Sequence, residues 1–261
     1  MCIVHYTQSN LAVVRLGRHM SVTFAVIDAS VGETPAESNL RRELDGEVVV
    51  YKASEGEFPP SVSASEWRFD GVVISGSQTS AYDDRDWIHE LTEWIRRVHR
   101  ADVPTLGICW GHQFLAQALG GRVVDMAEYE LGYERIVRLG DDPLFEGLPE
   151  RFVSFETHSD RVAELPPGAM TLARNGHGVQ AFRIGSSYGI QFHPEYDRET
   201  AVWVTEGKDL PDDRKRSVLD GITDESVEAA RASKQIFENF RRLAERHQPV
   251  RRAGPIPPRT R

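Results

Sequence analysis

Short apolar runs alternate with longer stretches of mixed polarity through the first half of this 261-residue chain. The short runs are rich in Val and Ile and are followed by turn-forming residues, as buried β-strands are. They predict strands at 22–28, 47–52, 70–75 and 103–109. Between them, apolar residues recur at helical spacing, most clearly from Trp87 to Val98. Helices are predicted at 33–45, 85–100 and 110–121, the last ended by Gly120 and Gly121.

The second half of the chain changes character. Short apolar runs separated by Gly, Pro and Asp predict added strands, some of them antiparallel. These runs are "ERIVRL", "RFVSFE", "MTLARN", "VQAFRI" and "YGIQFH", between residues 134 and 193. A last helix is predicted at 223–247, with Thr223 as its N-cap and one apolar face. The pattern predicts an α/β fold, a three-layer sandwich with a mainly parallel central sheet and added antiparallel strands.

The same pattern divides the chain into one domain and its additions. The domain is expected at 20–205, and residues 206–248 form a C-terminal extension that carries the last helix. Residues 1–19 show no clear period and are interpreted as a leader outside the fold, with Met20 as a candidate start. The segment 249–261 is rich in Pro and Arg and is predicted to be disordered.

Composition excludes several classes of protein. A formal net charge of -9 and a pI near 5.5 argue against a nucleic-acid partner. No apolar stretch reaches the roughly 18 to 20 residues that a membrane span needs, and the N-terminus lacks the order of a secretory signal. Two cysteines, Cys2 and Cys109, are too few for a disulfide framework and fit a reducing compartment. We therefore expect a cytoplasmic protein without a membrane or nucleic-acid partner.

One of these cysteines stands in a distinctive setting. In Gly107-Ile108-Cys109-Trp110-Gly111 an apolar strand runs into a tight turn and the next residues open a helix, as in the nucleophile elbow G-x-S-x-G. A lone cysteine is more often a small, inert core residue. Here the side chain is expected at the carboxyl edge of the sheet and at a helix N-terminus, which favours the thiolate. The context predicts that Cys109 is a nucleophile.

A thiol nucleophile needs a base, and the best candidate ends another apolar run. His193 lies in "YGIQFHPEYD", and Glu195 follows two residues later to orient its imidazole. On its own, His-x-Glu also fits a histidine held by local hydrogen bonds. No pair among His112, His158 and His193 has zinc-ligand spacing, so no metal site is expected, and no cofactor.

"LGICWGHQ" followed by "GIQFHPE" resembles the class I glutamine amidotransferase family, whose members use a Cys-His-Glu triad and have a flavodoxin-like fold. The similarity covers about residues 22–205, and the loops "SGSQTSAYDDRDWI" and "THSDRV" look most like the free-standing branch related to the glutaminase part of GMP synthetase. The chain departs from that part in one segment, because "SGSQTSAYD" stands where Gly-Gly-Pro is typical.

The resemblance implies roles for particular residues. Cys109 would be the nucleophile, His193 the general base and acid, and Glu195 the orienting carboxylate. Backbone N–H groups of Gly76 and Trp110 would form the oxyanion hole. The residues implied to bind substrate are Gln113, Ser77, His158 and Ser159.

The function implied is hydrolysis of the glutamine side-chain amide through a γ-glutamyl thioester on Cys109, releasing ammonia. No Gly-rich phosphate loop of the G-x-x-x-x-G-K type is present, so a separate synthetase or acceptor subunit is a possible partner. Two alternatives stay open. One is a γ-glutamyl hydrolase or peptidase that uses the same triad without ammonia transfer, and the other is a non-catalytic binding or regulatory subunit.

Overall fold

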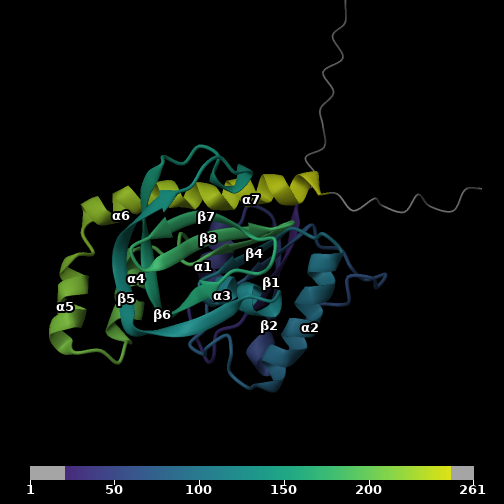
Figure 1. Cartoon of the computed structure of the whole chain (residues 1–261), viewed down its shortest axis with the longest axis horizontal. Coiled ribbons are helices and arrows are strands. Elements are labelled where there is room, and N and C mark those ends of the chain that lie inside the picture. Colours follow the sequence, from purple (N-terminus) through teal and green to yellow (C-terminus); the bar gives the residue numbers. More distant parts are fainter. Residues whose placement is uncertain (1–20, 248–261) are drawn as a thin grey trace, which may run out of the picture.

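The computed structural model describes residues 21–247 (Figure 1). The leader predicted at 1–19 and the tail predicted at 249–261 lie outside the described residues, so both stay predictions. None of the helices between residues 21 and 247 is both long and apolar enough to cross a membrane.

The described residues form a nine-stranded mixed sheet in the order β2-β1-β3-β4-β9-β8-β7-β5-β6. Its strands are β1 (Thr23–Asp28), β2 (Glu47–Lys52), β3 (Gly71–Ile74), β4 (Thr105–Ile108), β5 (Arg122–Arg138), β6 (Arg151–Glu164), β7 (Met170–Asn175), β8 (Gly178–Ile184) and β9 (Ser187–Ile190). The neighbours from β2 to β9 pair in parallel, and the remaining pairs are antiparallel. This confirms the predicted α/β fold with a parallel centre and added antiparallel strands.

Seven α-helices accompany the sheet within the described part of the chain. They are α1 (Ala36–Glu43), α2 (Asp86–Arg100), α3 (Trp110–Ala118), α4 (Arg198–Glu206), α5 (Asp212–Asp220), α6 (Asp224–Ala230) and α7 (Gln235–Arg246). Three 3₁₀ turns lie at Ala53–Glu55, Pro143–Phe145 and Arg231–Lys234. Gly120 follows α3 with a φ of 102°, which is the left-handed conformation of a helix stop.

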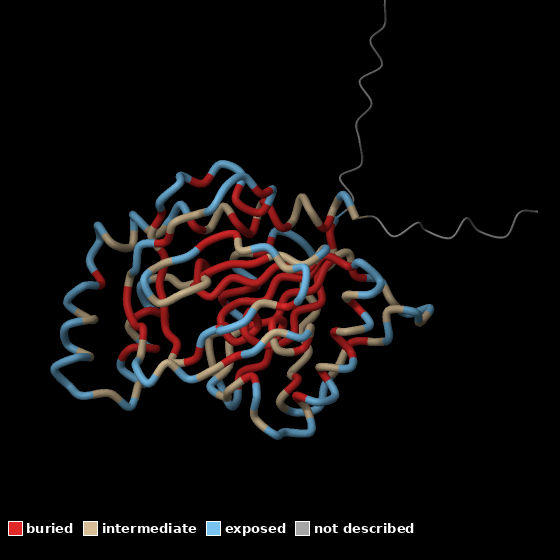
Figure 2. Tube along the Cα trace, viewed as in Figure 1, coloured by how far each residue is buried: buried red, intermediate tan, exposed pale blue. Residues whose placement is uncertain are grey.

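The two faces of the sheet bury separate cores, because successive side chains of a strand point to opposite faces. Phe24 and Val26 of β1 pack with α1 and α7, whereas Ala25 and Ile27 pack with α2 and α3. Helices thus cover both faces, and the buried residues concentrate along the central strands (Figure 2). The result is the three-layer sandwich expected from the sequence.

The C-terminal helical segment differs from the single helix predicted at 223–247. Thr223 is the N-cap as expected, in a capping box with Ser226, but α6 gives way to a 3₁₀ turn before α7 begins. In that turn the Ser233 hydroxyl bonds to the Ala230 carbonyl at 2.7 Å and meets Ser154 of β6 at 3.3 Å. The interruption of the helix thus falls where this segment contacts the sheet. Two further helices, α4 and α5, were not predicted.

Two strand boundaries also differ from those predicted. The run "ERIVRL" belongs to a much longer β5 that starts at Arg122 and contains a register shift between Asp125 and Glu130, with Ala127 at a φ of 59°. The strand predicted to reach His193 ends at Ile190. Beyond it the chain turns so that the N–H of His193 donates to the Phe155 carbonyl of β6 at 2.8 Å.

Candidate active site

Cys109 lies between the end of β4 and the start of α3. It has a φ of 53° and a ψ of -106°, an uncommon backbone conformation for a residue with a side chain. Holding it there costs on the order of 1–3 kcal/mol, which the surrounding structure must supply. Its N–H is bound to the Ile190 carbonyl of β9 at 2.8 Å. The strand-to-helix turn predicted from the sequence is therefore present.

The glycines on either side of Cys109 are required by close contacts of the backbone. A Cβ at Gly107 would lie 2.3 Å from the Gly111 carbonyl oxygen, and a Cβ at Gly111 would lie 2.5 Å from that of Ile74. Both distances are shorter than a carbon and an oxygen can approach without displacing the main chain. The turn can thus place α3 directly against β3 and β4 only with glycine at these two positions.

His193 and Glu195 form a buried pair beside Cys109. The imidazole Nδ1–H donates to the Glu195 carboxylate at 2.6 Å, and the Tyr196 ring stacks on the imidazole with centroids 4.1 Å apart. Cys109 Cβ and His193 Cε1 both lie within 4 Å of the point that a Cβ at Gly76 would occupy, at 3.8 and 3.3 Å. The structure therefore brings the thiol and the imidazole to the same small space in front of Gly76.

The electrostatics of this pair favour a protonated imidazole. Burial lowers the pKa of His193, but the charges of Glu195 and then of Cys109 outweigh burial and raise it to about 10. His193 Nε2 has no hydrogen-bond partner within residues 21–247 and stays available to the thiol or to a substrate. Arg42 of α1 supports the segment by donating to the Glu195 carbonyl and by pairing with Asp197 at 2.9 Å.

The two backbone N–H groups predicted to form an oxyanion hole are those of Gly76 and Trp110. Trp110 opens α3, where the first N–H groups have no partner inside the helix, and Gly76 follows the end of β3. In the described part of the chain neither N–H donates a hydrogen bond. Both residues flank Cys109, in sequence or in space, as an oxyanion hole requires.

A pocket opens in front of Cys109 and His193. Its walls carry the hydroxyl groups of Ser30, Thr34 and Thr157, the apolar side chains of Leu40 and Val204, and the ammonium group of Lys208. Ser77 also lines it, as predicted for a substrate-binding residue. The thiol of Cys109 itself approaches the Thr157 carbonyl at 3.8 Å.

Three of the residues predicted to bind substrate lie outside the lining of this pocket. Gln113 is buried, and its amide donates to the Asp160 carbonyl at 2.8 Å and to Gln191 Oε1 at 3.0 Å. His158 is buried as well, and its backbone neighbour Thr157 faces the pocket while Ser159 does not. Sequence reasoning missed Ser30, Thr34, Thr157 and Lys208, since only the folded chain brings these scattered residues together.

His158 belongs to a buried acidic cluster behind the pocket. Its Nδ1–H donates to the Asp160 carbonyl at 2.8 Å, while Nε2 faces Glu130 at 2.9 Å and Glu156 at 3.4 Å. Burial lowers the pKa of His158, but the two carboxylates outweigh burial and raise this pKa well above its ordinary value. Burial raises the pKa of Glu156 to about 7. The ligand atoms of these three residues lie within 4.8 Å of one another, so among residues 21–247 this is the group that has the composition to hold a metal ion.

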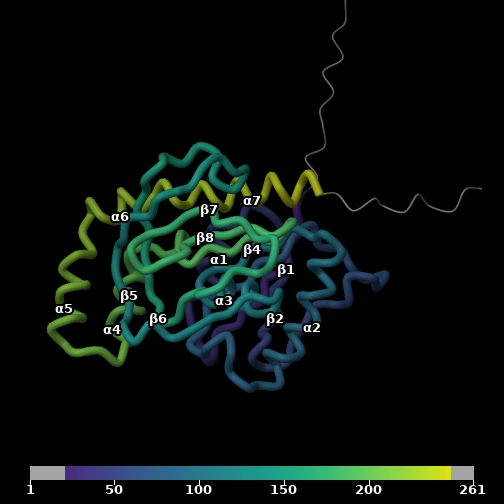
Figure 3. Tube along the Cα trace, in the orientation of Figure 1, coloured from purple at the N-terminus to yellow at the C-terminus, as the bar shows by residue number. Residues whose placement is uncertain are grey.

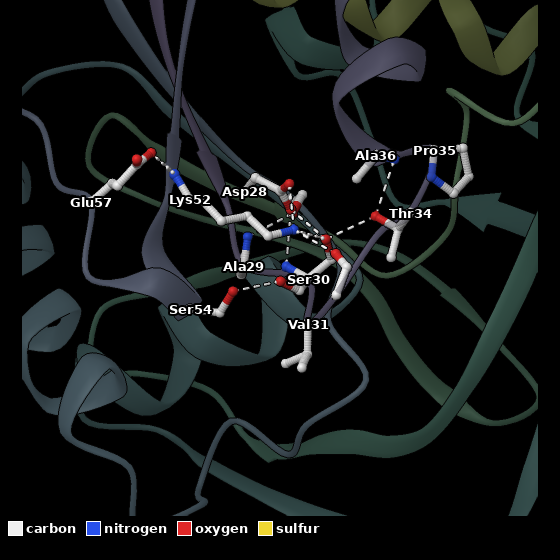
Figure 4. A network of polar contacts seen from close by, with 12 residues as sticks. Asp28, Ala29, Ser30, Val31, Thr34, Pro35, Ala36, Lys52, Ser54 and Glu57 are labelled. Carbon is white, nitrogen blue, oxygen red and sulfur yellow. Dashed lines mark hydrogen bonds and ion pairs between the residues drawn. The ribbon is translucent and has the colours of Figure 1, made fainter.

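A polar network fixes the wall of the pocket that follows β1 (Figure 4). The Lys52 ammonium donates to Asp28 at 2.9 Å and to Ser30 at 2.8 Å, and Ser30 also meets Thr34 at 2.8 Å. Asp28 and Lys52 are the last residues of β1 and β2 and are partners in the sheet register. The ion pair therefore holds the loop that carries two of the pocket's hydroxyl groups.

A thiol, an imidazole and a carboxylate gathered at the carboxyl edge of a parallel sheet are typical of α/β enzymes that cleave amides through a thiol nucleophile. The family follows from comparison with known proteins. The family model for glutamine amidotransferase class-I matches residues 25–202, so the chain belongs to the class I glutamine amidotransferase family. It is an enzyme of that family, as the resemblance implied.

The relatives by sequence include two kinds of enzyme. The chain is 39% identical over 126 residues to a GMP synthase [glutamine-hydrolyzing] of Thermomicrobium roseum, which covers 48% of this chain and 23% of that protein. It is 34% identical over 157 residues to gamma-glutamyl peptidase 4 of Arabidopsis thaliana. This match covers 57% of this chain and 62% of that protein. The chain thus spans about a quarter of the synthase and under two thirds of the peptidase.

Solved structures support the fold. A glutamine amidotransferase from Thermotoga maritima superposes with a TM-score of 0.68 at 24% identity, covering 88% of this chain and 99% of that one. A glutamine amido transferase from Methylobacillus Flagellatus gives a TM-score of 0.70 at 24% identity, covering 87% and 96%. At this identity the likeness confirms the fold of the family and nothing finer.

Proposed function

We propose that the protein hydrolyses the side-chain amide of glutamine through a γ-glutamyl thioester on Cys109. The observation that carries the proposal is the meeting of Cys109, in its strained turn, with the buried His193–Glu195 pair in one pocket. Family membership and the glutamine-hydrolysing relatives support the same chemistry. The reaction needs no cofactor, because the thiol supplies the nucleophile and the imidazole moves the protons.

In the proposed mechanism each step has its own group. The Cys109 thiolate attacks the amide carbon, and the N–H groups of Gly76 and Trp110 bind the oxygen as it becomes negative. The imidazolium of His193 gives its proton to the departing ammonia. Formation of the thioester removes the negative charge of Cys109, one of the two charges that raise the pKa of His193. The imidazole is then better able to stay neutral, take a proton from water and direct that water to the thioester.

A second candidate function is γ-glutamyl hydrolase or peptidase activity. A second hollow lies beside the catalytic pocket and shares Thr34, Pro35 and Trp203 with it. This hollow gives space for a leaving group larger than ammonia. The gamma-glutamyl peptidase relative is also the one whose length this chain covers more fully.

The acceptor of the ammonia belongs to the proposal as well. The GMP synthase relatives support a synthetase as the acceptor of the ammonia. In the peptidase alternative no acceptor is required.

Replacing Cys109 by Ala tests the common core of both candidates. We expect Cys109→Ala to abolish release of ammonia from glutamine and of glutamate from γ-glutamyl amines, with Cys2→Ala, the other cysteine, as matched control. The ratio of the two wild-type activities separates glutaminase from peptidase. A Cys109→Ala enzyme that keeps its activity would refute the thioester mechanism, and a wild type that is inactive on both substrates would favour a binding or regulatory subunit.

A further inference from the structure

Among residues 21–247, Lys208 is the one Lys or Arg that lines the catalytic pocket. The only carboxylate in that lining, Glu195, is committed to His193 at 2.6 Å. The chain as a whole carries a net charge of -9, so a carboxylate group of a substrate meets a favourable field only beside a local positive charge. Lys208 supplies that charge inside the pocket.

The position of Lys208 is fixed by the docking of α4. Ala201 and Val204 of α4 pack in one apolar cluster with Leu131 and Phe155, and the Lys208 N–H bonds to the Thr205 carbonyl at 3.3 Å just after the helix. Lys208 lies beyond residue 202, where the match to the family model ends. The charge therefore comes from a segment that follows the residues matched by the family model.

A chain of contacts links Lys208 to the thiol. Its Nζ lies 5.0 Å from the ring centroid of Tyr129, whose hydroxyl meets Thr157 Oγ1 at 3.2 Å. Thr157 lines the pocket, and its carbonyl lies 3.8 Å from Cys109 Sγ. No carboxylate in residues 21–247 forms an ion pair with Lys208, so its ammonium has an aromatic face beside it but no anionic partner.

We propose that Lys208 binds the α-carboxylate of γ-glutamyl substrates, an inference that rests on the proposed function. In such a substrate the carboxylate lies at the opposite end from the amide that Cys109 attacks. The Lys208 ammonium lies over the ring of Tyr129, whose hydroxyl meets Thr157. When the amide of the substrate faces the thiol, its α-carboxylate reaches this ammonium. The hydroxyl groups of Ser30 and Thr34 offer acceptors for the α-ammonium group.

The proposal defines a substrate class. The enzyme accepts glutamine and γ-glutamyl amines or peptides that have a free α-carboxylate, and it discriminates against substrates in which that carboxylate is amidated. Loss of one charge-assisted hydrogen bond of this kind weakens binding roughly 10- to 100-fold. The effect belongs to substrate binding, because Lys208 takes no part in proton transfer or attack.

Kinetics of Lys208→Met test the contact. We expect KM for glutamine to rise roughly 10- to 100-fold while kcat changes by only about a factor of two or three, and Lys208→Arg to recover part of the loss. Lys215→Met is the matched control, because Lys215 lies on the neighbouring α5, pairs with Asp212 at 3.5 Å and does not line the pocket. A fall in kcat with unchanged KM would overturn the assignment.

The preference for substrates with a free α-carboxylate gives a second test. A lysine with a merely structural role would not affect this preference. The wild type should prefer glutamine to its α-amide, and Lys208→Met should lose most of that preference. Labelling of Cys109 by 6-diazo-5-oxo-L-norleucine, which carries the α-carboxylate, should slow in Lys208→Met, whereas labelling by iodoacetamide, which lacks it, should not. Equal slowing with both reagents, or no slowing with either, would refute the role of Lys208.

Binding of L-glutamate tests the role of Lys208 independently of the proposed reaction. Calorimetry on the Cys109→Ala protein should show binding of L-glutamate that Lys208→Met weakens roughly 10- to 100-fold. An inactive wild type that still binds glutamate through Lys208 would refute the proposed function alone. An active wild type whose glutamate affinity is unchanged in Lys208→Met would refute this inference alone.

Discussion

At the scale of single residues, the site depends on an ion pair held out of water. Glu195 is accessible over only 5% of its surface and His193 over 4%, so the positive charge of His193 needs a partner close by. Carboxylate and thiolate together hold a proton on His193 well above neutral pH, where the pKa of about 10 places it. The proton that the leaving group needs is therefore already in position before a substrate arrives.

Glu195→Gln should release that proton at a lower pH. The amide keeps the shape of the side chain but removes the largest influence that raises the pKa of His193, so burial then dominates and the pKa falls from about 10. The imidazolium persists below the pKa and is lost as pH rises through it, so its titration in the variant moves to lower pH. Carbon-13 NMR of the histidine rings measures the midpoint, and kcat should fall on the order of 100-fold or more.

The matched control for this change is Glu199→Gln, an exposed carboxylate on the neighbouring α4. It should leave both the midpoint and kcat unchanged. A midpoint for His193 in Glu195→Gln equal to that of the wild type would show that Glu195 does not set the charge of the imidazole.

Cys109, His193 and Glu195 could be found from the sequence because each lies in a short motif at the end of an apolar run. The remaining lining of the pocket could not. Lys208 has no motif around it, and Thr157 reaches the pocket through the pairing of β6 with β5. Gln113 shows the opposite case, since helical spacing from Cys109 did not reveal that Asp160 and Gln191 would occupy its amide.

At the scale of elements, the turn between β4 and α3 sets the position of the nucleophile. Its geometry was predictable because glycines at fixed spacing report close backbone contacts in any fold. The long β5 and the broken helix before α7 were not predictable. Their forms depend on contacts far along the chain, such as that between Ser233 and Ser154.

Gly107→Ala should disrupt this turn. The new methyl group would lie 2.3 Å from the Gly111 carbonyl oxygen and 2.8 Å from Leu115, so α3 must move away from the sheet. We expect a loss of about 1–3 kcal/mol in the free energy of unfolding, measured by urea denaturation, together with a fall in kcat.

Gly176→Ala provides the comparison. A Cβ at Gly176 meets no atom within 4 Å, and its φ is not positive, so stability should change by less than about 0.5 kcal/mol. If Gly107→Ala were as stable and as active as Gly176→Ala, the backbone contact would not be what holds the turn.

At the scale of the whole molecule, the helix predicted as part of an extension belongs to the main core. Ile236, Phe237 and Phe240 of α7 are buried in the same cluster as Phe24 of β1, and the rings of Phe24 and Phe240 stack with centroids 5.9 Å apart. Figure 3 shows α7 in yellow running along the body built by the purple and green segments. The sequence indicated an apolar face on this helix but not the surface that it covers.

Phe240→Ala should therefore destabilise the entire domain. Removing a fully buried phenylalanine costs about 3–5 kcal/mol, a large share of the stability of a typical domain. Thermal denaturation of the variant should show one transition at a clearly lower temperature, with Arg246→Ala, an exposed residue of the same helix, close to the wild type. A small effect of Phe240→Ala, or a separate early transition for α7, would indicate that the helix is an accessory.

The stacking of Phe240 on Phe24 also bears on how the protein is made. A ribosome delivers β1 long before it delivers α7, so the face of the sheet that holds Phe24 and Val26 has no permanent cover while the intervening residues are being translated. Such a nascent chain exposes a large hydrophobic surface, to which chaperones bind. This face of the sheet can be buried, and the fold completed, only after residues 236–244 have left the exit tunnel.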